Sequence, residues 1–205
     1  LVAFLVKLPA FPVHTWLPDA HTEAPTAGSV LLAGVLLKMG GYGILRFCLP
    51  MFPEACAILR PWMVALGLIG ILYGALLVLV QDDLKRLVAY SSVSHMGYVL
   101  VGAFSGMAAG VTGAALQMIT HGITTGGLFL AVGMLYERTH TRRLADLGGL
   151  ALLMPRYAWG LLVLALASLG LPGTGGFVGE FLVLVGAFQY RPVVGGLAAL
   201  GVVLA

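Results

Sequence analysis

The chain has 205 residues, of which 60% are apolar and only 9% are charged, and its mean hydropathy is +1.03. No soluble domain of this size has such a composition, so we interpret the chain as an integral membrane protein. The net charge of +3 comes from basic residues scattered through helices and short loops, and without a dense basic patch it argues against a nucleic-acid-binding surface.

Proline, glycine and charge clusters divide the chain into seven apolar segments, since a bilayer core of roughly 30 Å takes about 20 helical residues. The segments are 1–17, 25–49, 61–80, 84–104, 110–136, 155–190 and one that starts near residue 192. We therefore predict an all-α polytopic membrane protein with about six to seven transmembrane helices. Both ends lie inside apolar runs, so we expect residues 1–205 to be a single internal fragment of a larger proton-translocating domain.

Two of the segments, 1–17 and 155–190, are predicted to be broken helices. The first is rich in proline, and the second is too long for one straight span and carries a glycine-rich stretch near its middle. The predicted helix breakers are Pro9, Pro12, Pro18, Gly170, Pro172, Gly173, Gly175 and Gly176. Unwound backbone at membrane depth persists only where protein or a water-filled cavity satisfies its polar groups, so each break predicts an interior site.

The two broken helices should run in opposite directions, because five crossings separate the first segment from the sixth. Paired broken helices of opposite direction are typical of transporters built from inverted repeats. Loop charge predicts the orientation, since cytoplasmic loops carry more lysine and arginine. The loops after the first, third and fifth segments contain Lys85, Arg86, Arg138, Arg142, Arg143 and Arg156, whereas the other loops contain Arg46, Arg60 and Arg191. We expect the first set to be cytoplasmic.

Five ionisable side chains lie within the apolar segments, and they are Lys7, Lys38, His95, His121 and Glu180. A charge in hydrocarbon is unfavourable, so such residues predict an ion or proton path. Lys38 lies too deep to reach the interface comfortably, although reaching it is the alternative. For Glu180 the alternative is an exposed carboxylate at the end of its span, but residues 177–188 are otherwise strongly apolar.

The two histidines lie at matching depth in neighbouring segments. Each could serve only as a hydrogen bond between helices. Nearby hydroxyl groups favour a second interpretation, in which they hold ordered water and the histidines pass protons. These hydroxyl groups belong to Tyr90, Ser91, Ser94, Thr120, Thr124 and Thr125.

Other motifs in the chain fit known sites poorly. The glycines of 173–179 imitate a dinucleotide-binding loop, but their spacing is wrong and no strand precedes them. The polar residues of 14–23 match no common metal site, so we interpret them as an interfacial polar turn and expect no metal. Cys48 and Cys56 flank one loop, where two isolated buried thiols are favoured over a disulfide.

Several long motifs, in order along the chain, resemble the antiporter-like membrane subunits of respiratory complex I. They include KLPAFPVHTWLP from Lys7, DLKRLVAYSSVSHMG from Asp83, MITHG from Met118 and LPGTGGFVGEF from Leu171. The resemblance covers essentially the whole chain and extends to multi-subunit cation/proton antiporters. Within the family the chain is most similar to the branch called subunit M in bacteria and subunit 4 in mitochondria, because Glu180 stands where sister subunits usually have lysine.

This resemblance implies a fold of fourteen transmembrane helices with inverted repeats, of which the chain would hold roughly the seventh to the start of the thirteenth. It also implies a proton path in which Lys7 changes the proton affinity of Lys38, and the proton passes through His95 and His121 towards Glu180. In that family the first lysine pairs with a glutamate on an earlier helix. The chain itself is expected to hold no cofactor and no catalytic redox residue, with NADH, FMN, iron-sulfur clusters and quinone in other subunits.

We therefore expect the chain to translocate protons as one subunit of NADH:quinone oxidoreductase, with other membrane subunits, including sister antiporter-like subunits, as partners. One alternative is a subunit of a multi-subunit Na⁺/H⁺ antiporter or of a membrane-bound hydrogenase complex. A second is a membrane scaffold whose polar side chains only pack helices. Asp19 and the arginine-rich loop after Tyr136 favour a bacterial inner membrane over a mitochondrial or plastid one.

Overall fold

The computed structural model describes residues 1–204, and every regular element among them is a helix. The α-helices are α1 (Val2–Lys7), α2 (Trp16–Glu23), α3 (Thr26–Leu31), α4 (Leu37–Gly43), α5 (Leu49–Met51), α6 (Pro53–Val78), α7 (Leu84–Phe104), α8 (Ala108–Thr139), α9 (Leu150–Leu153), α10 (Pro155–Ser168), α11 (Gly175–Tyr190) and α12 (Pro192–Leu204). The predicted all-α fold is confirmed.

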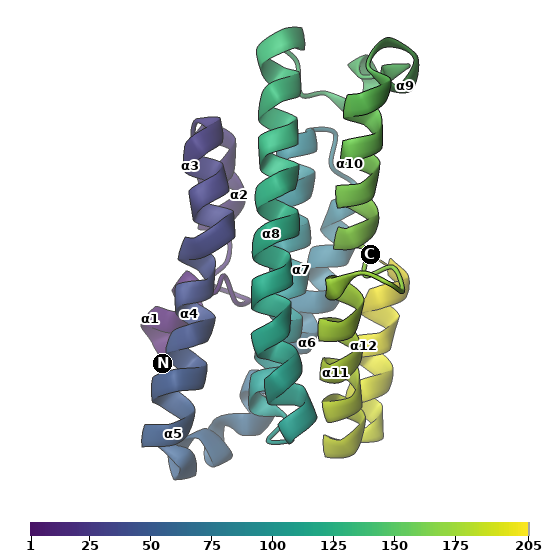
Figure 1. The fold of residues 1–205 in the computed structure, drawn as a ribbon. Coiled ribbons are helices and arrows are strands. Elements are labelled where there is room, and N and C mark those ends of the chain that lie inside the picture. The colour runs from purple at the N-terminus through teal and green to yellow at the C-terminus, as the bar shows by residue number, and fades with distance from the viewer. Residues whose placement is uncertain (205) are drawn as a thin grey trace.

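Four helical stretches are long and apolar enough to cross a membrane, and they are Thr26–Met51, α6, α7 and α8. They stand side by side with the shorter helices (Figure 1), with α1–α5 on one flank, α7 and α8 in the middle, and α10–α12 on the other. Of the most apolar part of α7, 83% is buried inside the protein, against 39–56% for the other three. The polar residues of α7 are therefore enclosed by neighbouring helices.

Both predicted helix breaks are present. Residues 8–15 separate α1 from α2, and residues 169–174 separate α10 from α11. The two broken helices run in opposite directions, and both breaks lie near the middle of the bundle (Figure 1). Gly175 is not part of the break but begins α11, because the extended residue Thr174 directly before it caps that helix. Pro18 lies within the first turn of α2, where its missing N–H has no helical partner to lose.

The prediction that the third helix begins at Pro61 is wrong. Helix α6 begins at Pro53, and Pro61 lies within it. A proline inside a helix leaves the carbonyl four residues earlier without its N–H partner, which here is the carbonyl of Ala57. Ala57 is in the first turns of α6 and is exposed, so this carbonyl can find another partner outside the protein.

The span Thr26–Met51 contains two π-helical turns that its apolar sequence did not predict. They cover Leu32–Leu36 and Ile44–Cys48, and the helix α4 between them carries Lys38. Single π turns within α-helices are frequent at functional sites.

Helices α6 and α7 pack closely through glycines. A Cβ atom at Gly74 would lie 2.8 Å from the backbone nitrogen of Ser94, and one at Gly97 would lie 2.8 Å from the carbonyl oxygen of Gly67. Small residues allow this approach of two backbones in a membrane. The contact fixes α7 on both sides of His95.

The loops after the first, third and fifth predicted segments meet at one end of the bundle. The carboxylate of Asp83 lies 3.4 Å from the guanidinium of Arg142, and Arg86 lies 2.8 Å from Asp19. The backbone of Leu144 also donates to the carbonyl of Asp82 at 2.9 Å. The predicted grouping of these loops on one face is therefore confirmed.

Candidate functional site

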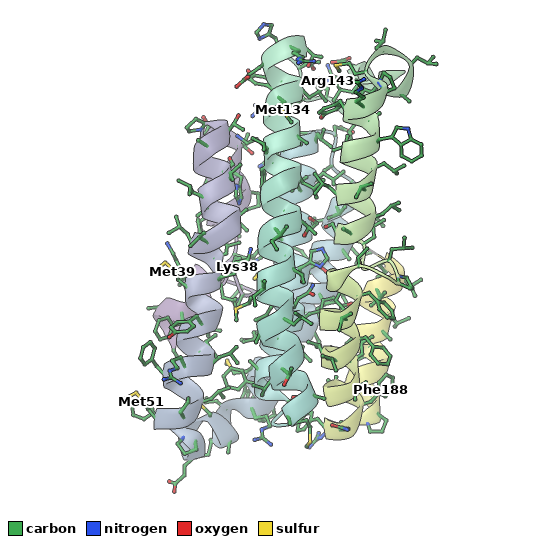
Figure 2. All side chains as sticks on the ribbon, in the orientation of Figure 1. Lys38, Met39, Met51, Met134, Arg143 and Phe188 are labelled. Carbon is green, nitrogen blue, oxygen red and sulfur yellow. The ribbon has the colours of Figure 1, made fainter. Side chains whose placement is uncertain are left out.

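The side chain of Lys38 lies between α4 and α8 (Figure 2). Its Nζ is 2.6 Å from Nδ1 of His121 on α8 and donates a hydrogen bond to the carbonyl of Ala33, five residues earlier in the first π turn. His121 is buried, with 3% of its surface exposed, and Lys38 is partly buried. The π turn thus brings a backbone acceptor to the ammonium group within the span.

The contact between Lys38 and His121 constrains where protons reside. A charged ammonium offers only donors, so His121 accepts through Nδ1 and carries its own proton on Nε2. The Nε2 atom is buried and has no hydrogen-bond partner within residues 1–204. The imidazole can therefore take a proton from Lys38 at one nitrogen and release one from the other.

A second cluster surrounds the carboxylate of Glu180. Its Oε1 lies 3.0 Å from Nδ1 of His95 and accepts a hydrogen bond from Nε2 of Gln117 at 2.9 Å. The other ring nitrogen of His95 is 3.4 Å from the hydroxyl of Ser168 at the end of α10. Glu180 is 5% exposed, which rules out the exposed carboxylate considered above. Four helices, α7, α8, α10 and α11, thus meet at one carboxylate.

The two clusters are joined by the imidazoles of His95 and His121. Their ring centroids are 5.3 Å apart, with an angle of 64° between the rings. We call the connected side chains Lys38, His121, His95 and Glu180 the polar row. The predicted order, with His95 before His121, is wrong, because α8 lies between α4 and α7 and its histidine must come first.

Lys7 is not brought into the polar row. It is the last residue of α1, is partly buried, and makes no side-chain hydrogen bond or ion pair with any residue of 1–204. Helix α1 packs against α4, where a Cβ atom at Gly40 would lie 2.6 Å from the backbone nitrogen of Leu8. Lys7 is therefore on the helix next to the one that carries Lys38.

Most of the predicted water-holding hydroxyls donate to backbone carbonyls. Ser91 donates to Val88, Ser94 to Ile71, Thr120 to Leu116, and Thr124 to Thr120. Thr125 differs, because its hydroxyl is buried without a partner among the described residues. Tyr90 is partly buried. A cavity of about 250 Å³, lined in part by Ser91, Ser94, His95 and Ser168, extends from the polar row towards the start of α7.

Three residues of the site were missed in the sequence. Gln117 lies four residues before His121, hence on the same face of α8, and this spacing was the signal that could have found it. Ser168 and Gly170 flank the break between α10 and α11, and a Cβ atom at Gly170 would lie 2.6 Å from Oε2 of Glu180. Their role depends on how the break folds, which the sequence does not show.

The interpretation of residues 14–23 as an interfacial polar turn is wrong for its two histidines. Both are buried, His14 against the rings of Phe11 and Tyr73 and His21 against the ring of Phe129. The cysteines are confirmed as free, buried thiols, and Sγ of Cys56 donates to the carbonyl of Cys48 at 3.3 Å.

Comparisons with known proteins give a consistent result. Residues 1–205 match the family described as NADH:quinone oxidoreductase/Mrp antiporter, TM. The chain is 57% identical over 204 residues to NADH-quinone oxidoreductase subunit M of Pseudomonas aeruginosa, an alignment that covers 100% of the chain and 40% of that protein.

Solved structures show the same fold. A chain of respiratory complex I from Thermus thermophilus with bound NADH superposes with a TM-score of 0.95 at 41% identity, over 99% of this chain and 44% of that one. A chain of the Mrp complex from Dietzia sp. superposes with a TM-score of 0.93 at 26% identity, over 99% and 38%. The sequence thus spans about two fifths of the length of such relatives.

Proposed function

The chain belongs to the NADH:quinone oxidoreductase/Mrp antiporter transmembrane family, and from this premise we propose that it carries protons along the polar row as an antiporter-like subunit of an NADH:quinone oxidoreductase. The continuous contact from Lys38 to Glu180 is the observation that carries the proposal. The 57% identity to a subunit M favours this enzyme complex over the Mrp type, whose chain is 26% identical.

Each step of the proposed transfer moves one proton between neighbouring groups. The Lys38 ammonium gives a proton to Nδ1 of His121, and the ring releases its other proton from Nε2 towards His95. His95 then gives its Nδ1 proton to the carboxylate of Glu180, 3.0 Å away. The histidines return to neutral after each passage, so the net result is one proton moved from lysine to glutamate.

Neighbouring groups of the polar row influence one another electrostatically. Two unit charges separated by the 5.3 Å between the histidine rings interact by about 3 kcal/mol at an effective dielectric of about 20. That energy changes the ratio of protonated to deprotonated ring by roughly 10²-fold. A charge that arrives at one end of the row can therefore displace a proton further along it.

The rest of the proposed assembly follows from the relatives. We assign NADH, FMN, iron-sulfur clusters and quinone to other subunits, and to this chain a share in the translocase without redox chemistry of its own. Lys7, on the helix next to Lys38, is the proposed input of the coupling signal. The partners are other membrane subunits, including sister antiporter-like subunits, in a bacterial inner membrane, as the bacterial subunit M relatives support.

The test is proton pumping per NADH oxidised, measured in sealed vesicles that contain the full complex with Lys38→Ala or the size-matched Lys38→Met. Co-purified subunits are quantified to establish assembly. Arg46→Ala is the control, since it removes an exposed cation from the same span. We expect pumping to collapse in both Lys38 variants and to persist in the control. Normal pumping with Lys38→Met would leave the scaffold interpretation standing.

The structural match to the Mrp complex supports a second candidate, a subunit of a multi-subunit cation/proton antiporter. The two functions differ in their driving reaction. Proton movement that requires NADH oxidation and persists without sodium supports the first, and movement that requires a sodium gradient and no NADH supports the second.

A further inference from the structure

His21 on α2 is buried without hydrogen-bond partners for its ring. None of its surface is exposed, and it stacks on Phe129 of α8 with ring centroids 4.3 Å apart and 15° between the planes. Neither ring nitrogen has a hydrogen-bond partner among the residues described. Buried polar groups are normally satisfied by protein or by ordered water, so this position favours water as the partner of His21.

Two further buried polar groups without partners lie on the same face of α8. His121, Thr125 and Phe129 follow one another at four-residue steps, each step a rise of about 6 Å along one face. Within residues 1–204, Nε2 of His121 and the hydroxyl of Thr125 lack hydrogen-bond partners. The unpartnered groups therefore form a line from the polar row to His21, with Thr125 between them.

Beyond His21 this line reaches a polar cavity. The cavity has a volume of about 530 Å³ and lies between the α2–α3 connection and α8, lined by Thr22, Glu23, Thr26, Lys85, Glu137 and Arg142 among others. Gly133, one turn of α8 beyond Phe129, also lines it. This is the end of the bundle at which Arg143 lies and the basic loops meet (Figure 2). Acidic and basic side chains both face the cavity, so water can fill it and protons can exchange there.

We propose that His21 and Thr125 form an inlet branch that conducts protons through bound water from this cavity to His121 and Lys38. The inference rests on the proposed function and adds the place at which protons reach the polar row. His21 takes a proton at the ring nitrogen nearer the cavity and releases one from the other nitrogen. The Thr125 hydroxyl accepts one hydrogen bond and donates one, and no net charge stays in the branch after each passage.

A purely structural role of His21, as a ring packed on Phe129, is the competing explanation. His21→Phe separates the two, because phenylalanine keeps an aromatic ring on Phe129 but carries no proton. His14→Phe is the matched control. His14 is buried in the same broken helix and also has an unpartnered Nδ1, but it contacts Phe11 and Tyr73 of α6 instead of α8.

Thr125 allows a second, sterically mild test. Thr125→Val keeps the shape of the side chain and removes the hydroxyl, whereas Thr125→Ser keeps the hydroxyl. All variants are measured in the full complex in sealed vesicles, as protons pumped per NADH and as pumping rate, with subunit content quantified.

We expect His21→Phe and Thr125→Val to lower the pumping rate at least about tenfold, because a positioned acid–base group contributes ~10²–10⁴-fold and water replaces part of it. His14→Phe and Thr125→Ser should pump normally. Normal pumping in His21→Phe and Thr125→Val, with loss in Lys38→Ala, would overturn the inlet branch and leave the polar row standing. Normal pumping in all three would overturn the proposed function itself. Equal loss in His21→Phe and His14→Phe would assign His21 a structural role.

Discussion

Glu180 is held against the backbone of the second helix break, and Gly170→Ala tests whether this position matters. An alanine Cβ at Gly170 would lie 2.6 Å from Oε2 of Glu180, whereas ordinary contact begins at 3.4 Å. The carboxylate must therefore move by about 0.8 Å, the difference between these two distances. Gly170 also has a φ of +68°, so alanine adds backbone strain of about 1–2 kcal/mol.

The displacement acts on the two hydrogen bonds that hold Oε1. These bonds, from His95 and Gln117, are 3.0 and 2.9 Å long, and a shift of this size takes them beyond hydrogen-bond distance. A hydrogen bond to a charged group contributes ~1.5–3 kcal/mol, and misplacing a reacting group by about 1 Å costs up to ~10²-fold in rate. We expect Gly170→Ala to lower the pumping rate by ~10- to 10²-fold.

Gly173→Ala provides the control within the same break. Gly173 has a φ of +100°, so alanine is strained there as well, but its Cβ would meet no atom within 4 Å. Both variants are assayed as protons pumped per NADH in sealed vesicles, with assembly established from the co-purified subunits. A normal rate in Gly170→Ala, or an equal loss in both variants, would refute the link between Glu180 and this glycine.

Two further predictions address the neighbours of Glu180 and the loop end of the bundle. Gln117→Leu removes one of the two donors to Glu180, so we expect pumping to slow about tenfold, given ~1.5–3 kcal/mol for such a bond. An unchanged rate would contradict the role of this donor. Asp83→Ala removes the side chain that caps α7 and pairs with Arg142, and it should lower stability by about 1 kcal/mol. Thermal unfolding of the purified complex measures this, and an equal effect of Asp82→Ala, whose side chain is exposed, would contradict it.

The sequence predicts helix boundaries well where a local signal acts alone. Helix α7 spans the predicted 84–104 because Asp83 accepts hydrogen bonds from the backbone of Lys85 and Arg86 at its start. Pro61 is misleading because the carbonyl it leaves unpaired is on an exposed part of α6, which no local pattern reveals. The π turns are also invisible, since each adds a single residue to a continuous apolar run.

The members of the polar row could be identified from the sequence, but their order could not. An ionisable group within an apolar span stands out because its burial is unfavourable, and this identified all four residues. Their order depends on α8 lying between α4 and α7, which is a property of the packed bundle. His21 was interpreted as interfacial because of its polar neighbours in sequence, whereas the stacking on Phe129 joins residues more than 100 positions apart.

The first π turn has a consequence for the angular position of Lys38. Bonding from residue i to i+5 accommodates one residue more than a regular turn, and one residue corresponds to about 100° around a helix axis. Without the turn at Leu32–Leu36, the segment after it would be rotated by that angle relative to α3, and Lys38 would face away from His121. The azimuth of this lysine is thus encoded by the number of residues between Thr26 and Leu37, so a single-residue deletion there would disconnect it while leaving every side chain of the row in the protein.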